Sequence, residues 1–190
     1  MSSQQAANSR GGRRIDVAIA EPFRKELSAA WLKKVAADAL QSALPEGEPG
    51  QLSLVVTDDD TLRELNREFR GLDEVTDVLS FSAHHAGHWA GDGAEPEDRY
   101  VKNGGSADMS FVFPPGELPV LGEIAISYPQ ARRQAQERNE PEERELALLI
   151  VHGVLHLVGH DHLDPEETEQ MQAKERAALA TVFPIGVHRG

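Results

Sequence analysis

Cysteine is absent from the 190-residue sequence. The chain therefore has no disulfide framework, no thiolate that could bind a metal ion and no thiol nucleophile. Any metal ion must be held by nitrogen or oxygen atoms from histidine, aspartate or glutamate side chains. Any nucleophile or metal ligand in this protein must therefore come from a residue type other than cysteine.

Long apolar runs are also absent. The longest uninterrupted apolar stretch covers only residues 146–151, whereas a membrane-spanning helix needs about 18 or more apolar residues. Residues 1–14 are polar, carry Arg10, Arg13 and Arg14, and lack the apolar core of a secretory signal. We interpret them as a disordered basic arm, with a transit peptide as the alternative, and residues 15–190 as one domain. The expected location is the cytoplasm, with no membrane partner.

Positive charge is scarce as well. Lys and Arg supply 19 charges against 32 from Asp and Glu, which gives a net charge of −13. Proteins that coat nucleic acid by bulk electrostatics are usually basic, so this balance argues against that class but leaves a local phosphate site open. The acid lies late in the chain: residues 1–70 hold 10 basic and 11 acidic side chains, and residues 71–190 hold 9 and 21. We expect a solvated acidic face on the later helices.

Apolar periodicity predicts strands that alternate with helices early in the chain and helices alone near its end. Strands are expected at residues 15–20, 52–57, 75–81 and 120–127. Helices are expected from Pro22 to about residue 39, after the aspartates at 58–60, at 128–138, from Pro141 onward, and from 164–165 to about 182. We interpret the aspartates as a helix cap and not as a metal site. The order indicates an α+β fold, a single domain with a small mixed sheet of about four strands.

Residues 82–116 interrupt this pattern. They are rich in Gly, His, Asp and Glu and contain an apolar island at 109–113, which is typical of a long inserted loop with a short hairpin. His84, His85 and His88 raise the alternatives of a second metal site or an extra RNA contact. We favour a flexible insertion with incidental histidines.

The strongest signal is a cluster of histidines at 152–162. His152 and His156 are four residues apart on a predicted helix, so both side chains project from one face and can bind the same ion. Gly159 can then turn the chain back and bring a third histidine to that ion. The spacing H-x-x-x-H-x-x-G-x-x-H, a zincin-like pattern found in metzincin proteases, selects His162, with His160 as the alternative. Three imidazoles favour zinc, although nickel, copper or cobalt also fit such ligands.

One residue expected in a peptidase is missing. In H-E-x-x-H proteases the glutamate after the first histidine is the general base. Here that position is Gly153, which has no side chain. Peptide hydrolysis by that mechanism is therefore disfavoured, and a reaction at this site would depend on the metal and on a separate group that handles charge.

Three sequence blocks resemble the YbeY-type ribosomal RNA maturation endoribonucleases. The first is Asn-Arg-Glu-Phe-Arg at 66–70, followed by Thr-Asp-Val-Leu-Ser-Phe at 76–81; the second is Leu-Gly-Glu-Ile-Ala-Ile at 121–126; and the third is the histidine cluster. Their order and the intervening helices extend the resemblance over most of residues 15–182. Ser82 departs from the proline that commonly follows the Leu-Ser-Phe run, which changes the entry to a loop.

The resemblance implies a zinc-dependent endoribonuclease that prefers single strands and acts in 3′-end maturation of small-subunit (16S) rRNA and in ribosome quality control. It assigns one zinc ion per chain to His152, His156 and His162. It makes His152 and Arg70 catalytic, and a guanidinium suits a phosphate because it binds two oxygens at once. The basic arm and the arginines at 132 and 133 are further groups that could meet phosphate.

The resemblance also implies ribosomal partners. Glu123 occupies a position where the family often carries aspartate and would contact a small-subunit ribosomal protein; an assembly GTPase is a second expected partner. A solvent-facing acid is the alternative for Glu123.

Asn66 and Asp77 are further candidates. They either shape the cleft, or they have only structural roles, Asn66 in the helix and Asp77 at the start of the strand. Asp161 would orient a ligand imidazole or lie in solvent. For the whole chain, the alternatives are a metallohydrolase acting on peptides or small amides and a non-catalytic ribosome-assembly factor.

Overall fold

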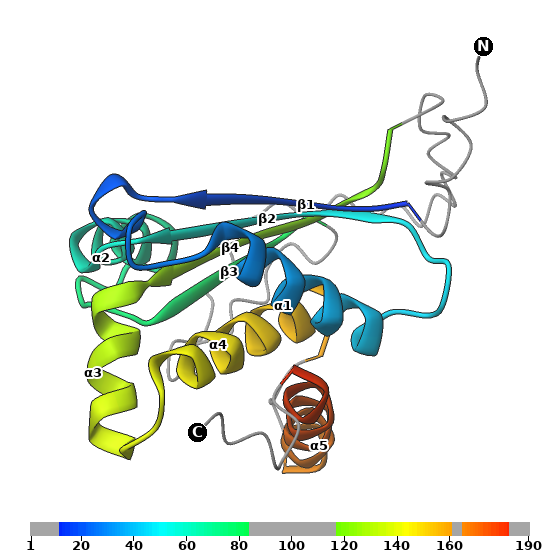
Figure 1. Cartoon of the computed structure of the whole chain (residues 1–190). Coiled ribbons are helices and arrows are strands. Elements are labelled where there is room, and N and C mark those ends of the chain that lie inside the picture. Colours follow the sequence, from blue (N-terminus) through cyan, green and yellow to red (C-terminus); the bar gives the residue numbers. More distant parts are fainter. Residues whose placement is uncertain (1–11, 84–116, 161–164, 183–190) are drawn as a thin grey trace.

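A computed structural model describes residues 12–83, 117–160 and 165–182 (Figure 1). Four strands form one sheet in the order β1-β2-β4-β3. Strands β1, β2 and β4 run parallel, and β3 pairs antiparallel with β4 at the sheet edge. Their bounds are β1 Arg13–Ile19, β2 Gly50–Thr57, β3 Val78–Ser82 and β4 Val120–Ser127. The expected mixed sheet is confirmed.

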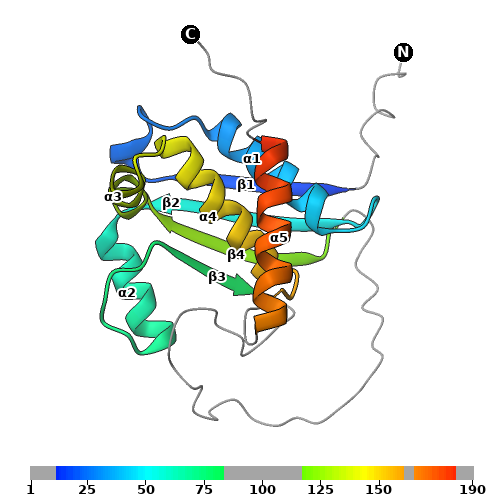
Figure 2. The same cartoon turned by 90° about the horizontal axis from the view of Figure 1, so that it is seen from below.

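Helices cover both faces of the sheet. Figure 2 shows α1, α4 and α5 in front of the sheet, and α2 beside β3 and β4. The bounds are α1 Ala29–Ala43, α2 Asp59–Arg70, α3 Tyr128–Arg138, α4 Glu142–Leu157 and α5 Pro165–Val182. The arrangement is α+β, as predicted. Within the described residues, no helix is both long and apolar enough to cross a bilayer.

The alternation of side chains along β4 creates two apolar clusters. Ile124 and Ile126 are fully buried on the face that carries α1 and α4. Ala125 points the other way and packs with Leu62 of α2 and Leu79 of β3. Helix α4 is therefore held against the main core, and α2 is held against the opposite face of the same edge of the sheet.

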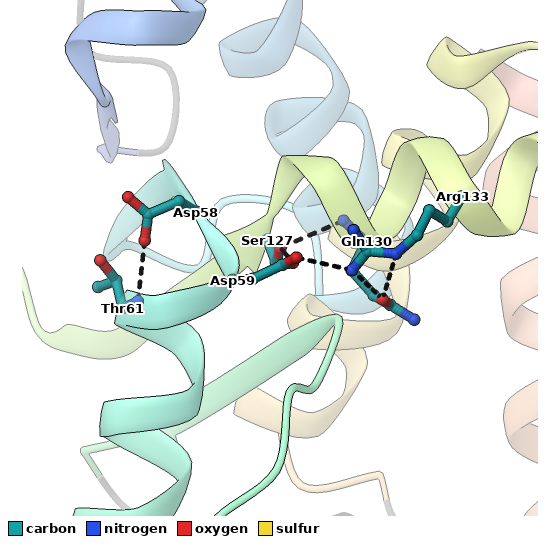
Figure 3. Close-up of polar contacts among 6 residues, drawn as sticks. All are labelled: Asp58, Asp59, Thr61, Ser127, Gln130 and Arg133. Carbon is teal, nitrogen blue, oxygen red and sulfur yellow. Dashed lines mark hydrogen bonds and ion pairs between the residues drawn. The ribbon is translucent and has the colours of Figure 1, made fainter.

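The start of α2 confirms the interpretation of the aspartate run as a cap. Asp58 Oδ1 accepts a hydrogen bond from the backbone N–H of Thr61 at 2.8 Å (Figure 3). This hydrogen bond lowers the pKa of Asp58 below its ordinary value. Gly71 ends the helix in a left-handed conformation with φ of 72°.

The predicted helix from Pro22 begins in the wrong place. Pro22 lies in a single 3₁₀ turn, η1 Glu21–Phe23, and α1 begins only at Ala29. Ser28 caps α1 by accepting from the N–H of Trp31 at 3.3 Å. Proline fits the first turn of a 3₁₀ helix and of an α-helix equally well. The position of Pro22 in the sequence therefore could not show which of the two begins there.

Two further boundaries differ from the sequence prediction. Arg13 and Arg14, assigned to the disordered arm, belong to β1, where the Arg13 guanidinium donates to the carbonyl of Pro45 at 2.7 Å. Strand β3 begins at Val78, because Asp77 Oδ1 accepts from the N–H of Val78 at 2.8 Å and caps the start of the strand. The rest of the arm, the predicted hairpin and the histidines at 84, 85 and 88 lie outside the described residues.

Gly122 allows a β-bulge in β4. The register between β2 and β4 shifts there, which leaves Leu121 as an extra residue. Gly122 has φ of 148°, and a Cβ atom at this position would lie 2.2 Å from the carbonyl oxygen of Phe81 and 2.7 Å from a methyl group of Leu157. Glycine is therefore required where β3, β4 and α4 meet, and the bulge sets the direction of Glu123.

We expect Gly122→Ala to destabilise the fold by about 4 kcal/mol or more, because backbone strain and steric overlap add. Gly47→Ala is the matched control: Gly47 has φ of 83° with nothing within 4 Å of its Cβ position, so it carries the strain alone, about 1–2 kcal/mol. Urea unfolding of both variants measures the difference. Equal losses would show that the overlap is relieved at no cost.

Glu145 gives stability a specific pH dependence. Its side chain is 3% exposed, and both carboxylate oxygens accept from Arg138 Nη1, at 2.8 and 2.7 Å. Burial raises the pKa of Glu145 above its ordinary value, and Arg138 only partly opposes this. The folded state therefore holds this proton more tightly than the unfolded state, so stability from this group is present at low pH and is lost as pH rises through the raised pKa.

We therefore expect the stability of the wild type relative to Glu145→Gln to fall as pH rises from about 4 towards 7. Chemical unfolding of both proteins across that range measures this difference. A difference that grows with pH would contradict the assigned direction.

Candidate active site

Two histidines of α4 place their ring nitrogens together. The Nε2 atoms of His152 and His156 are 2.9 Å apart, and the rings meet edge to face with centroids separated by 4.5 Å. Both side chains are half-buried, although most of the helix around them is buried. The two imidazoles therefore lie on one face of α4 with their Nε2 atoms close together, and that they bind a metal ion stays a prediction.

The chain turns back immediately after this pair. Helix α4 ends with Gly159 in a left-handed conformation with φ of 90°. The N–H of Gly159 donates to the carbonyl of His156 at 3.1 Å, and the N–H of His160 donates to that of Leu155 at 3.0 Å. This pair of bonds is a Schellman motif. The reversal predicted from Gly159 is therefore confirmed.

His160 is engaged away from the histidine pair. Lys174 of α5 donates to its Nε2 at 2.8 Å, and burial, with a smaller contribution from Lys174, lowers the pKa of His160. A lone pair used in this way is not available to a metal, which argues against His160 as the third ligand. His162 and Asp161 lie outside the described residues. Among the described residues, no group of three or more potential ligands gathers at one point, so the third ligand stays a prediction.

A glutamate from a different helix contacts the pair. Glu175 Oε1 of α5 lies 2.6 Å from His152 Nδ1. The side chain of Glu175 is only 16% exposed and that of His152 is 30% exposed. The sequence pattern did not indicate this residue, because it lies 23 positions from His152 and among other acids on the last helix.

Gly153 explains why this helix carries no H-E-x-x-H glutamate. A Cβ atom at Gly153 would lie 2.9 Å from two side-chain carbons of Ile124 in β4. The position therefore faces the sheet, at a point where α4 approaches β4 closely. A glutamate at this position would be forced into the core.

Arg70 is the last residue of α2. It is half-buried and makes no hydrogen bond or ion pair within the described parts of the chain. Asn66, one turn earlier and 1% exposed, donates to the carbonyl of Glu74 at 3.0 Å and so holds the loop that follows the helix. Asp77 accepts from the N–H of Val78 at 2.8 Å and from the side-chain amide of Gln134 in α3 at 2.9 Å, so the observed contacts of both Asn66 and Asp77 are structural.

The end of β3 connects α2 to α4. The rings of Phe69 and Phe81 meet edge to face at a centroid distance of 5.2 Å. The next residue, Ser82, donates through its hydroxyl to the carbonyl of Leu157 at 3.3 Å. The last turn of α2, which carries Arg70, and the last turn of α4 therefore both contact the same end of this edge strand.

Glu123 is exposed on β4 and pairs in register with Phe81 of β3 and Ser53 of β2. It lies two residues before Ala125, so the alternation of the strand puts it on the same face of the sheet as α2. No contact in the described structure gives it an internal structural role, which agrees with an exposed surface acid.

The arginines of α3 are occupied by acids. Arg133 Nη2 pairs with Asp59 Oδ2 at 2.8 Å and also donates to the side-chain oxygen of Gln130 (Figure 3). The hydroxyl of Ser127, which caps α3, donates to the other oxygen of Asp59 at 2.5 Å. Arg132 pairs with two glutamates. Asp59, Ser127 and Arg133 join the starts of α2 and α3, and a phosphate that bound either arginine would compete with these acids.

Comparison with known proteins gives one consistent result. A family model described as Endoribonuclease YbeY matches residues 18–182. The curated Endoribonuclease YbeY of Dehalococcoides mccartyi is 39% identical over 173 residues, which cover 90% of this chain and 98% of that protein. The corresponding protein of Roseiflexus sp. is 36% identical over 168 residues, 88% of this chain and 91% of that protein. A solution structure of a Thermotoga maritima protein shares the fold, with a TM-score of 0.52, 24% identity and 88% coverage of each chain.

The matches place the chain among enzymes of the nuclease class of hydrolases. The chain belongs to the Endoribonuclease YbeY family.

Proposed function

We propose that this protein is a zinc-dependent endoribonuclease that prefers single-stranded RNA. In this proposal it acts in 3′-end maturation of 16S rRNA and in ribosome quality control, in the cytoplasm. The observation that carries the proposal is the convergence of His152 and His156 on one point, in a chain of this family. Arg70 supplies the second, positively charged part of the site.

The histidine pair has the donor chemistry that a metal ion needs. Glu175 accepts a hydrogen bond from the Nδ1–H of His152, which leaves a lone pair on Nε2 directed towards His156. Two such lone pairs repel unless a proton or a cation lies between them. Nitrogens that share one zinc ion lie roughly 3.3 Å apart at bond lengths of about 2.0–2.1 Å, close to the observed 2.9 Å. We propose His162 as the third ligand.

Each residue of the site would perform a definite task. His152 and His156 would hold the zinc ion, and zinc, when bound, would supply Lewis-acid chemistry towards a phosphoryl oxygen. Arg70 would clamp a phosphate through two parallel hydrogen bonds and offset the negative charge that develops at phosphorus. Because Arg70 has no partner within the described residues, no internal ion pair has to break before it binds phosphate.

The charge distribution supports a substrate that is presented locally. The chain carries a net charge of −13, and Arg132 and Arg133 are already paired with acids. Tight, indiscriminate binding to RNA is therefore not expected. A small-subunit ribosomal protein bound at the exposed Glu123, or an assembly GTPase, would bring the rRNA to Arg70 and the histidines.

The test is cleavage of a single-stranded rRNA fragment by the purified, zinc-loaded protein. A DNA analogue of the same sequence and a casein digest serve as competing substrates. Cleavage of RNA alone supports the proposal and points to the 2′-hydroxyl as attacking group, whereas cleavage of both nucleic acids points to water. Proteolysis without RNA cleavage would establish the metallopeptidase alternative, and binding of rRNA without cleavage of any substrate would establish an assembly factor.

A further inference from the structure

Helix α5 presents two neighbouring charged residues to two different histidines. Lys174 donates to His160 Nε2 at 2.8 Å, and Glu175 contacts His152 Nδ1 at 2.6 Å. The two contacts are chemically opposite. A lysine donates and therefore occupies a lone pair of its histidine, whereas a glutamate accepts and leaves the lone pair at the far ring nitrogen available.

The position of Glu175 on α5 is set by packing. Met171 and Ala178 are 3% and 2% exposed and belong to the main core. Spacings of four and three residues put Glu175 on the same buried face as these two apolar residues. A carboxylate on such a face needs a donor, and the donor it meets is the imidazole of His152.

From this arrangement we propose that Glu175 is a positioning residue for the metal site. It accepts a hydrogen bond from the Nδ1–H of His152, fixes the tautomer with the lone pair on Nε2, and orients the ring towards His156. Together with Lys174 it selects His152 over His160 as a ligand. The inference rests on the proposed function, because it gives Glu175 a task only if the histidine pair binds a metal ion.

The contact between Glu175 and His152 links α5 to the proposed metal site. Helix α5 packs against both α1 and α4, and Glu175 connects it to the ligand on α4. Metal affinity should therefore depend on a residue of α5 that does not itself touch the ion. A residue that only completed the packing of α5 would change the stability of the metal-free protein and leave affinity and tautomer unchanged.

The test compares three full-length variants. Glu175→Met keeps the side-chain length and removes the acceptor, Glu175→Gln keeps an acceptor without the charge, and Glu169→Met is the control at an exposed acid of the same helix. Zinc affinity is measured by competition with a chromophoric chelator. The tautomer of His152 is read in the metal-free protein from long-range ¹⁵N–¹H spectra of the imidazole nitrogens.

We expect Glu175→Met to weaken zinc binding by ~10- to 100-fold and to lose the Nδ1-protonated tautomer of His152. Glu175→Gln, whose amide can accept from or donate to Nδ1, should bind zinc with an affinity between those of Glu175→Met and the wild type. Glu169→Met should match the wild type. Unchanged affinity and tautomer in folded Glu175→Met would overturn the inference. If Glu175→Met fails to fold, a Glu175→Gln protein that binds zinc with the full wild-type affinity would overturn it equally.

The outcome also separates this inference from the proposed function. If the wild type binds no zinc, or if His152→Ala binds it as tightly, the metal site itself fails. If the wild type binds one zinc ion, His152→Ala loses it and Glu175→Met retains it with full affinity, only the positioning role of Glu175 fails.

Discussion

His152→Ala is expected to reduce RNA cleavage by at least about 1,000-fold, because Lewis-acid stabilisation by a metal ion is worth several kcal/mol and each 1.4 kcal/mol is tenfold in rate. The substitution removes one of the two nitrogens that lie 2.9 Å apart and should abolish stoichiometric zinc binding. The fold should survive, since the side chain is half-buried and lies at the edge of the core. Single-turnover cleavage and metal content measure the effect.

His160→Ala is the matched control for this result. It removes a histidine from the same segment, but one that Lys174 already engages. We expect near wild-type cleavage and zinc content. Loss of both properties to the same extent in His160→Ala would show that the assignment of ligands within this segment is wrong.

Arg70→Glu is expected to lower cleavage by about 100- to 1,000-fold, the usual cost of losing one preorganised group that stabilises transition-state charge. Its effect on folding should be small, because Arg70 makes no ion pair within the described residues. Arg70→Lys should recover part of the rate, since lysine keeps the charge but not the two-pronged geometry. Rates measured at saturating RNA separate this effect from weaker binding.

Arg67→Glu controls for the general change in charge. Arg67 is on the same last turn of α2, is 60% exposed and has only a distant contact of 4.0 Å with Glu64. Both reversals carry the same unfavourable interaction with the helix dipole. If both variants lost equal activity, Arg70 would contribute to a diffuse electrostatic field and not to a specific clamp.

Much of the fold was predictable because its signals are local. The strand at residues 120–127 and the helix at 128–138 have the predicted bounds, since β-branched alternation and a serine cap act over a few residues. The start of α1 was not predictable from Pro22. It depends on the cap at Ser28 and on packing against α4, which become apparent only in the folded chain.

In the candidate site, too, some features follow from local sequence and others depend on long-range packing. The convergence of His152 and His156 follows from helical periodicity, and the turn after them follows from Gly159. The contact from Glu175 joins residues 23 positions apart and depends on how α5 docks, which no local pattern encodes. The reason for Gly153, close approach of α4 to Ile124, was likewise visible only in three dimensions, although its chemical consequence was clear from the sequence.

The later arginines show why the net charge alone was a poor guide. Arg132, Arg133 and Arg138 each pair with an acid contributed by another part of the fold. These ion pairs offset the positive charge of the arginines, and a phosphate would have to compete with the acids for them. Recognition of RNA by the chain's own side chains is therefore expected to centre on Arg70 and the histidine pair.

We propose that RNA cleavage requires a metal ion held by His152 and His156. The most direct test of this claim is cleavage of one single-stranded rRNA fragment by the protein after complete removal of metal, and again after addition of one equivalent of zinc. We predict that cleavage disappears with the metal and returns with the single equivalent of zinc. Full cleavage by the metal-free protein would contradict the claim.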